Sequence, residues 1–124
     1  MTVVVCELAV LEPQLLKLVD DERSLHGDVS WAEADGLMFS CPRCWVDNGR
    51  SLIGTHVMIC WRPHVGQEHT PRPGRWQMVG TSLADVSLVA GSSSIKIEGG
   101  CNAHFFVRNG QIQDMEGYTS PGTP

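Results

Sequence analysis

The chain has 124 residues, of which 42% are hydrophobic and 19% are charged, and its formal net charge at pH 7 is −5. These values are typical of one small globular domain with a single core, and they exclude an intrinsically disordered chain. The acidic balance argues against general nucleic-acid binding, which needs a basic surface. No apolar run approaches the ~20 residues of a membrane-spanning helix.

The N-terminal segment, residues 1–30, is predicted to be an arm or extension that packs on the main domain. Its first residues, MTVVVCELAV, lack the basic region of a secretory signal peptide, so we expect an intracellular protein. Residues 2–11 are apolar and β-branched, which fits a strand or an extended arm. The run LLKLV after Pro13 fits a short helix or a strand, and the polar residues 20–30 predict a loop.

Residues 31–115 are predicted to form one antiparallel β domain, followed by a flexible tail over residues 116–124. Ser30 and Glu33 have the spacing of a capping box, which predicts one short helical turn. Asn109-Gly110 lies between two apolar runs and predicts a tight hairpin. The predicted strands lie within residues 37–40, 51–61, 75–80, 82–91, 94–100 and 105–115. The fold class is therefore mainly β: a single small zinc-stabilised domain with an N-terminal arm and one short helix.

Two cysteine-containing pairs predict a metal site. Cys41 and Cys44 are three positions apart, and so are Cys101 and His104. Each pair is flanked by turn-forming residues, and together they supply the four ligands of a tetrahedral Cys₃His zinc site. Four protein ligands leave no position for water or substrate, so the zinc is expected to be structural. It would connect the beginning of the β region to its end.

Other readings of these residues stay open. The four residues could be buried thiols and a core histidine, or Cys41 and Cys44 could form a redox dithiol, although the βαβ context of that motif is not predicted. His56 and Cys60 are too far apart along a strand to share an ion, so at most one could approach the metal. His64, in a Pro-rich loop, would need that loop to fold inward.

The segment from Arg43 to Arg75 carries five arginines, three histidines and only two acids, so it could meet an anionic partner, although a solvated loop is the simpler interpretation. Interface centres favour tryptophan and arginine, which predicts a partner-binding surface there. The competing explanation is that the tryptophan rings cover the zinc site. The predicted partner-binding residues are Arg62, Arg72, Arg75, Trp61 and Trp76.

Four runs of the sequence carry a resemblance to a known family: AEADGLMFSCPRCW, IGTHVMICW, PGRWQMVGTSLADVSL and GGCNAHFFVRNGQI. Together they resemble a family of small proteins of tailed bacteriophages and prophages, over roughly residues 31–113. The resemblance implies a phage origin and a metal-binding β domain, located in the virion or the host cytoplasm. It implies no catalytic residue.

The sequence contains no nucleophile elbow and no Gly-rich phosphate loop, and we expect a non-enzymatic structural or interaction protein. Its expected partner is another phage protein or a second copy of the chain, as a virion component or assembly factor. The alternative is an effector that binds and inhibits a bacterial host protein. A metal-dependent hydrolase or redox enzyme is a third reading.

Overall fold

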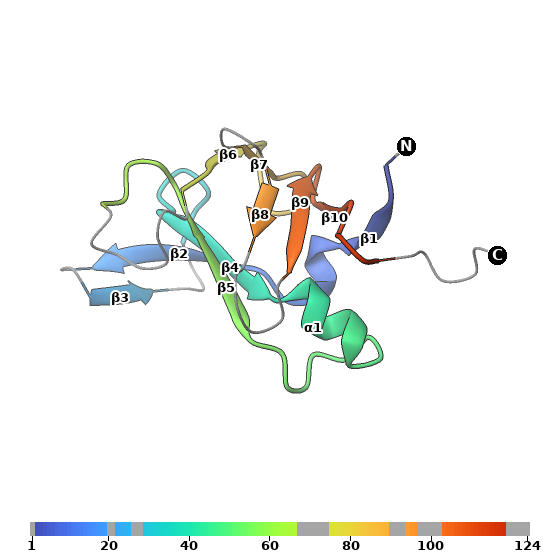
Figure 1. Ribbon diagram of the computed structural model, residues 1–124. Coiled ribbons are helices and arrows are strands. Elements are labelled where there is room, and N and C mark those ends of the chain that lie inside the picture. Colours follow the sequence, from blue (N-terminus) through green and yellow to red (C-terminus); the bar gives the residue numbers. More distant parts are fainter. Residues whose placement is uncertain are drawn as a thin grey trace.

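Short apolar runs separated by turn-forming residues form strands here, and the predicted mainly β fold is confirmed. The computed structural model describes residues 2–19, 22–25, 29–66, 75–89, 94–96 and 103–118 (Figure 1). The described strands are β1 (Val4–Glu7), β2 (Gln14–Val19), β3 (Glu22–Leu25), β4 (Gly36–Ser40), β5 (Val57–Trp61), β6 (Gln77–Val79), β7 (Ser87–Val89), β8 (Ser94–Lys96), β9 (His104–Arg108) and β10 (Gln111–Gln113). The described helices are the 3₁₀ helix η1 (Leu8–Leu11) and the α-helix α1 (Pro42–Asp47).

The strands make three antiparallel sheets. One sheet has the order β1-β10-β9-β8, the second has the order β3-β2-β4-β5, and β6 and β7 form a two-stranded sheet. The N-terminal residues contribute to both larger sheets, because β1 pairs with β10 near the C-terminus and β2 pairs with β4. Figure 1 shows β1 beside β10. The run LLKLV is therefore strand, and residues 1–30 supply sheet strands.

The main core lies between the two four-stranded sheets. Phe39 of β4 and Phe105 of β9 are fully buried, and their rings meet edge to face with centroids 6.2 Å apart. Around them pack buried residues from both sheets and the segments between, among them Leu8, Leu11, Leu37, Val86, Leu88, Val107 and Ile112. A second, smaller cluster of Leu16, Trp61 and Val65 covers the other face of the β2-β4-β5 sheet. Central strands of this sheet are thus apolar on both faces.

One local prediction is wrong, and a second is confirmed only as a single turn. Residues 22–25 form strand β3 rather than part of a loop; β3 lies at the end of its sheet, and its sequence, ERSL, lacks the apolar alternation that marks a strand. The expected helical turn after Ser30 forms as a single turn over residues 31–33, in which the Ala34 N–H donates to the Ser30 carbonyl, but it does not continue into a helix. Its capping box does form, because the Glu33 N–H donates to Ser30 Oγ and the Ser30 hydroxyl donates to Glu33. The α-helix starts instead at Pro42, where β4 has ended.

The hairpin between β9 and β10 forms as predicted. Asn109 and Gly110 have φ angles of 52° and 70°, the left-handed pair that a type I′ turn requires. Neighbouring segments also hold this turn: the Gly110 N–H donates to the Val86 carbonyl, and its own carbonyl accepts the Leu8 N–H. The turn is therefore fixed by its local sequence and by its packing. No helix in the described part of the chain is long and apolar enough to cross a membrane.

Candidate metal site

The junction of β4 and α1 positions the two thiols of the CPRC motif. Cys41 is the N-cap of α1 with extended backbone, Pro42 follows in the first turn, and the Trp45 N–H donates to the Cys41 carbonyl. Proline suits this place because its fixed φ is helical and the missing N–H has no partner in a first turn. Residues three apart lie on one side of a helical turn. The helix start therefore brings Cys41 and Cys44 together.

Strand β5 brings His56 to the same place. The register pairs Ser40, the last residue of β4, with Val57, the first residue of β5. One step further, the Cys41 N–H donates to the His56 carbonyl at 2.9 Å, so this histidine lies opposite Cys41. The antiparallel return of the chain, and not sequence spacing alone, creates the contact.

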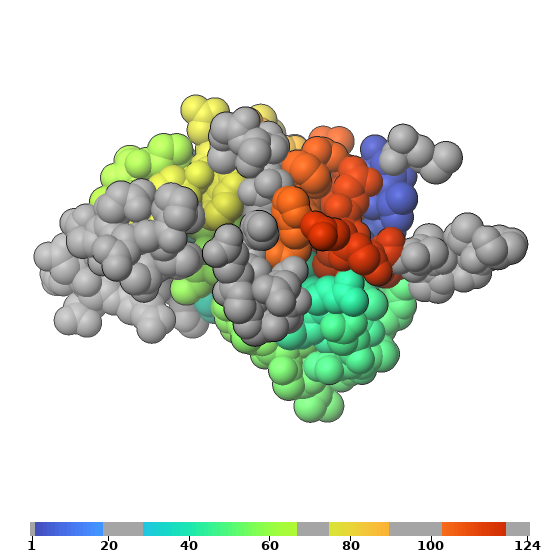
Figure 2. All heavy atoms as spheres, in the orientation of Figure 1, coloured from blue at the N-terminus to red at the C-terminus, as the bar shows by residue number. Residues whose placement is uncertain are grey.

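One donor atom from each of Cys41, Cys44 and His56 lies within 4.8 Å of the other two, so these residues are close enough to hold a metal ion. Cys41 is buried, Cys44 is half-buried and His56 is exposed. Two thiolates and an imidazole are donors that a borderline-soft divalent ion binds readily. Figure 2 shows α1 and the loop after it, coloured green to light green, projecting together at the bottom of the molecule. The group lies where α1 begins and where this loop enters β5.

This group overlaps the predicted ligand set only in part. Cys41 and Cys44 come together as predicted, whereas Cys101 lies outside the described residues. His104 is not a member of the group, and its Nδ1 lies 3.0 Å from the Glu116 carboxylate. The sequence predicted that at most one of His56 and Cys60 could approach the metal, and it did not decide between them. The signal for His56 in the sequence is a histidine immediately before a strand that pairs back onto the strand preceding CPRC.

The other described cysteines lie apart from this group. Cys60, the second candidate on β5, is buried in the main core, and burial raises the pKa of its thiol. Burial likewise raises the pKa of Cys6 on β1 to about 11. Both thiols are therefore harder to ionise than an exposed cysteine, and neither belongs to the group of three donors.

The CPRC motif does precede a helix, as redox dithiols do, but the chain context differs. Strands β4 and β5, on either side of α1, are antiparallel neighbours, so the helix is not part of a βαβ unit. The short helix is also tied to the C-terminal turn: Arg43 forms an ion pair with Asp47 at 3.3 Å and donates to the Glu116 carbonyl. Arg50 lies over the ring of the buried Trp45.

Two of the predicted partner-binding arginines make contacts inside the chain. Arg62 donates to the Trp31 carbonyl at 3.0 Å and lies over the Trp31 ring, and Arg75 donates to the carbonyls of Val65 and Gly66. Arg72 lies outside the described residues.

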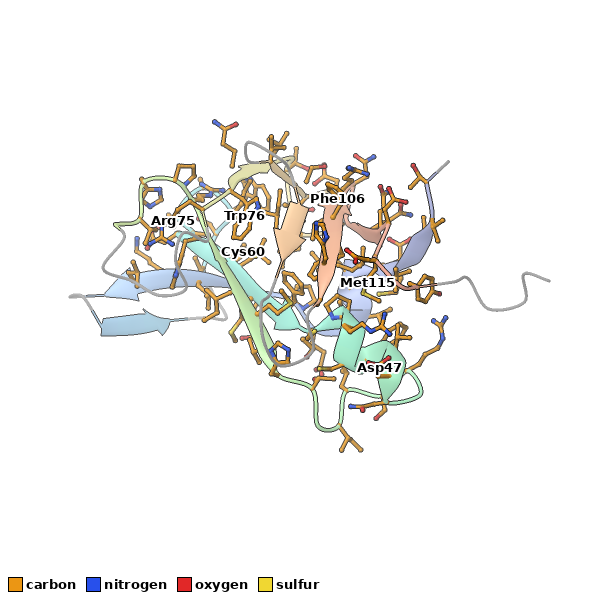
Figure 3. All side chains as sticks on the ribbon, in the orientation of Figure 1. Asp47, Cys60, Arg75, Trp76, Phe106 and Met115 are labelled. Atoms are coloured by element: carbon orange, nitrogen blue, oxygen red, sulfur yellow. The ribbon has the colours of Figure 1, made fainter. Side chains whose placement is uncertain are left out.

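The two predicted partner-binding tryptophans differ in exposure. Trp61 is buried, and Trp76 is half-buried against the main core. In Figure 3, Arg75 and Trp76 lie well away from Asp47 on α1. The arginine-tryptophan region and the metal group are therefore at different places on the molecule.

His64, the third histidine candidate, pairs with Asp35 instead of the cysteines. Its Nε2 lies 2.7 Å from Asp35 Oδ1, while Asp35 Oδ2 accepts the Leu18 N–H. Partial burial alone would raise the pKa of Asp35, but the hydrogen bonds from Leu18 and His64 outweigh it and lower this pKa. The pair fixes residues 62–66 against the β2-β4 sheet.

Comparison with known proteins adds no relative. No protein-family model matches the chain, and no curated protein or solved structure matches it significantly. The resemblance to small phage proteins stays a prediction from the sequence.

Proposed function

We propose that this chain is a zinc-stabilised β module that acts by binding another protein and not by catalysis. The observation that carries the proposal is the convergence of Cys41, Cys44 and His56 within 4.8 Å. Thiolate and imidazole donors in a tetrahedral arrangement favour zinc over the harder ions, which prefer oxygen ligands.

Cys101 is the proposed fourth ligand. The sequence predicts it as a ligand, and with His56 supplying the imidazole it completes a Cys₃His shell. In this scheme His104 is not a ligand and keeps its contact with Glu116. A shell of four protein ligands has no open position, so the ion is structural and the module has no metal-activated water.

The ion would stiffen a part of the chain that has little core of its own. α1 has six residues, which is too short to be stable alone, and the loop between α1 and β5 contains Ile53, which is 85% exposed. An ion held by Cys41, Cys44 and His56 would fasten the start of α1 to the start of β5. Binding energy of structural zinc reaches about 10–16 kcal/mol in finger peptides, enough to fix such a segment.

Metal analysis of the full chain tests this proposal. We expect one zinc per chain in natively purified protein, and loss of that zinc in Cys44→Ser and Cys101→Ser. His56→Gln should lose zinc, whereas His104→Gln, which changes the other histidine near a cysteine in the sequence, should keep it. Cobalt(II) substitution adds a second readout, because the thiolate-to-cobalt absorption falls with each cysteine removed.

Two results would contradict the proposal. Folded, natively purified protein without metal would show that the three donors are ordinary side chains. If His104→Gln loses the zinc and His56→Gln keeps it, the histidine ligand is His104, as the sequence predicted.

The proposed partner of the module is another phage protein, in a virion component or an assembly factor. The support is the resemblance of residues 31–113 to small phage proteins, together with a net charge of −5, which argues against general nucleic-acid binding. Detection of the chain in purified particles would agree with this role. Stable co-purification with one host protein from infected cells, and absence from particles, would favour the host-directed alternative.

A further inference from the structure

Strand β5 (VMICW) lies at the end of the β3-β2-β4-β5 sheet and carries no charge. The other end strands of the two four-stranded sheets each contain a charged residue: Glu7 in β1, Glu22 in β3 and Lys96 in β8. They are also shorter, with four, four and three residues against five in β5. Charges and short length are the usual means of preventing edge pairing, and β5 has neither.

The pairing of β5 with β4 fixes which backbone groups point outward. Cys41 donates to the His56 carbonyl, and Arg62 donates to the Asp35 carbonyl, so both of these opposed pairs are hydrogen-bonded. Hydrogen-bonded and non-bonded pairs alternate along an antiparallel ladder. Every second residue of β5, beginning with Val57, therefore directs its N–H and its C=O away from β4.

The three outward-pointing residues are Val57, Ile59 and Trp61. The Trp61 carbonyl accepts the Trp76 N–H at 2.9 Å, which confirms the direction and closes that end of the edge. Within the described ranges, no backbone hydrogen bond reaches Val57 or Ile59 from this side. The Val57 side chain is 54% exposed, so the edge is accessible there.

We propose that β5 pairs, antiparallel, with β5 of a second copy of this chain, about a two-fold axis at Met58. Val57 of each copy then lies opposite Ile59 of the other. This register joins the N–H and C=O groups of both residues to the matching groups of the partner. The result is one continuous eight-stranded sheet across the dimer.

The fit of this edge to itself favours a second copy over a different partner. Two-fold dimers are the commonest protein oligomers, and their interfaces use the same surface twice. Neither copy brings a charged residue of β5 into the contact, although the whole chain carries a net charge of −5. Because the contact of Trp61 with Trp76 limits pairing to the first three residues of β5, the dimer should be weak. The dimer is additional to the phage partner proposed above, and it rests on strand geometry and not on the metal.

Sedimentation equilibrium of the full chain tests the dimer between about 10 µM and about 1 mM, where short interfaces associate. The average mass should rise from 13.6 kDa toward twice that value as concentration increases. Val57→Lys places a charge against Ile59 of the other copy and brings two like charges diagonally across the two-fold axis, so it should raise the dissociation constant about tenfold or more. Val79→Lys is the matched control, because Val79 is 50% exposed but lies on β6, and it should leave the dissociation constant unchanged.

Ile59→Pro gives a second, backbone-specific test. The Ile59 N–H points away from β4, so proline removes a donor at the free edge without removing one from the β4-β5 ladder. We expect a folded monomer by circular dichroism, and if this variant does not fold, Val57→Lys decides alone. A wild-type chain that stays monomeric throughout overturns the proposal, and so does equal association of Val57→Lys and Val79→Lys. Zinc measured in the same samples separates this failure from failure of the metal proposal.

Discussion

The β9-β10 hairpin and the segment from α1 to β5 are fixed in different ways. The hairpin has its own turn signal, an alternating buried pattern, and contacts from η1 and from residues near β7. The segment from α1 to β5 has a six-residue helix and a loop with an exposed tip, and its strongest shared feature is the group of three donors. One region is held by packing and backbone pairing alone, whereas in our proposal a bound ion also holds the other.

The largest expected effect follows removal of the metal. A strong chelator should lower the Tm by about 10 °C or more, since structural zinc contributes folding free energy directly. Amide hydrogen exchange should accelerate first in residues 42–57 and last in residues 105–112. Equal protection of both regions with and without chelator would contradict the difference between them.

A pair of glycines tests how tightly the hairpin turn is held. Gly110 and Gly49 have nearly equal φ angles, 70° and 72°, so alanine costs about 1–2 kcal/mol at either from backbone strain alone. A Cβ at Gly110 would also lie 2.1 Å from the Ala84 carbonyl oxygen, whereas at Gly49 it would meet nothing within 4 Å. We expect urea denaturation to give a loss of about 3 kcal/mol or more for Gly110→Ala and about 1 kcal/mol for Gly49→Ala. Similar losses would mean that the turn is held by its local conformation only.

Phe39 and Phe105 connect the two regions, because one lies just before α1 and the other in the hairpin. A double-mutant cycle with leucine at both positions should give a coupling energy of about 1 kcal/mol, the value typical of edge-to-face aromatic pairs. Denaturation midpoints of the four proteins measure it. Additive losses would show that the two sheets meet without a specific contact between these rings.

The smallest expected effect on stability concerns Asp35, which directly precedes β4 at the end away from the metal group. The pKa of Asp35 is lowered in the folded chain, so its carboxylate stabilises the fold at any pH above the ordinary pKa of 3.8. This stabilisation is lost as the pH falls through the pKa of the folded state. Asp35→Asn should therefore be less stable than wild type at pH 7, by about 1 kcal/mol or less, and equally stable at the acid end. Thermal unfolding across pH checks this, and a difference that grows toward acid would reverse the sign.

Local signals determined much of this structure. The Asn109-Gly110 turn, the apolar strands on either side of it, and the CPRC pair follow from residue types and spacing, because each depends on neighbours a few positions away. Strand β3 gave no such signal, because its sequence, ERSL, has no apolar alternation and therefore resembles a loop. The place of the α-helix was missed because Ser30 and Glu33 cap a turn that does not continue, while Pro42 starts a helix inside a motif that also fits a tight turn.

What the sequence determined by itself was the β class, the hairpin, and two of the three donors. Only the tertiary structure decided that His56 is the third, because the pairing of β4 with β5 brings residues 15 positions apart in the chain face to face. It also decided that Arg62 and Arg75 donate to carbonyls of their own chain, and that β5 lies at the end of its sheet. Spacing along the chain sets which side chains are available, and strand register sets which of them meet.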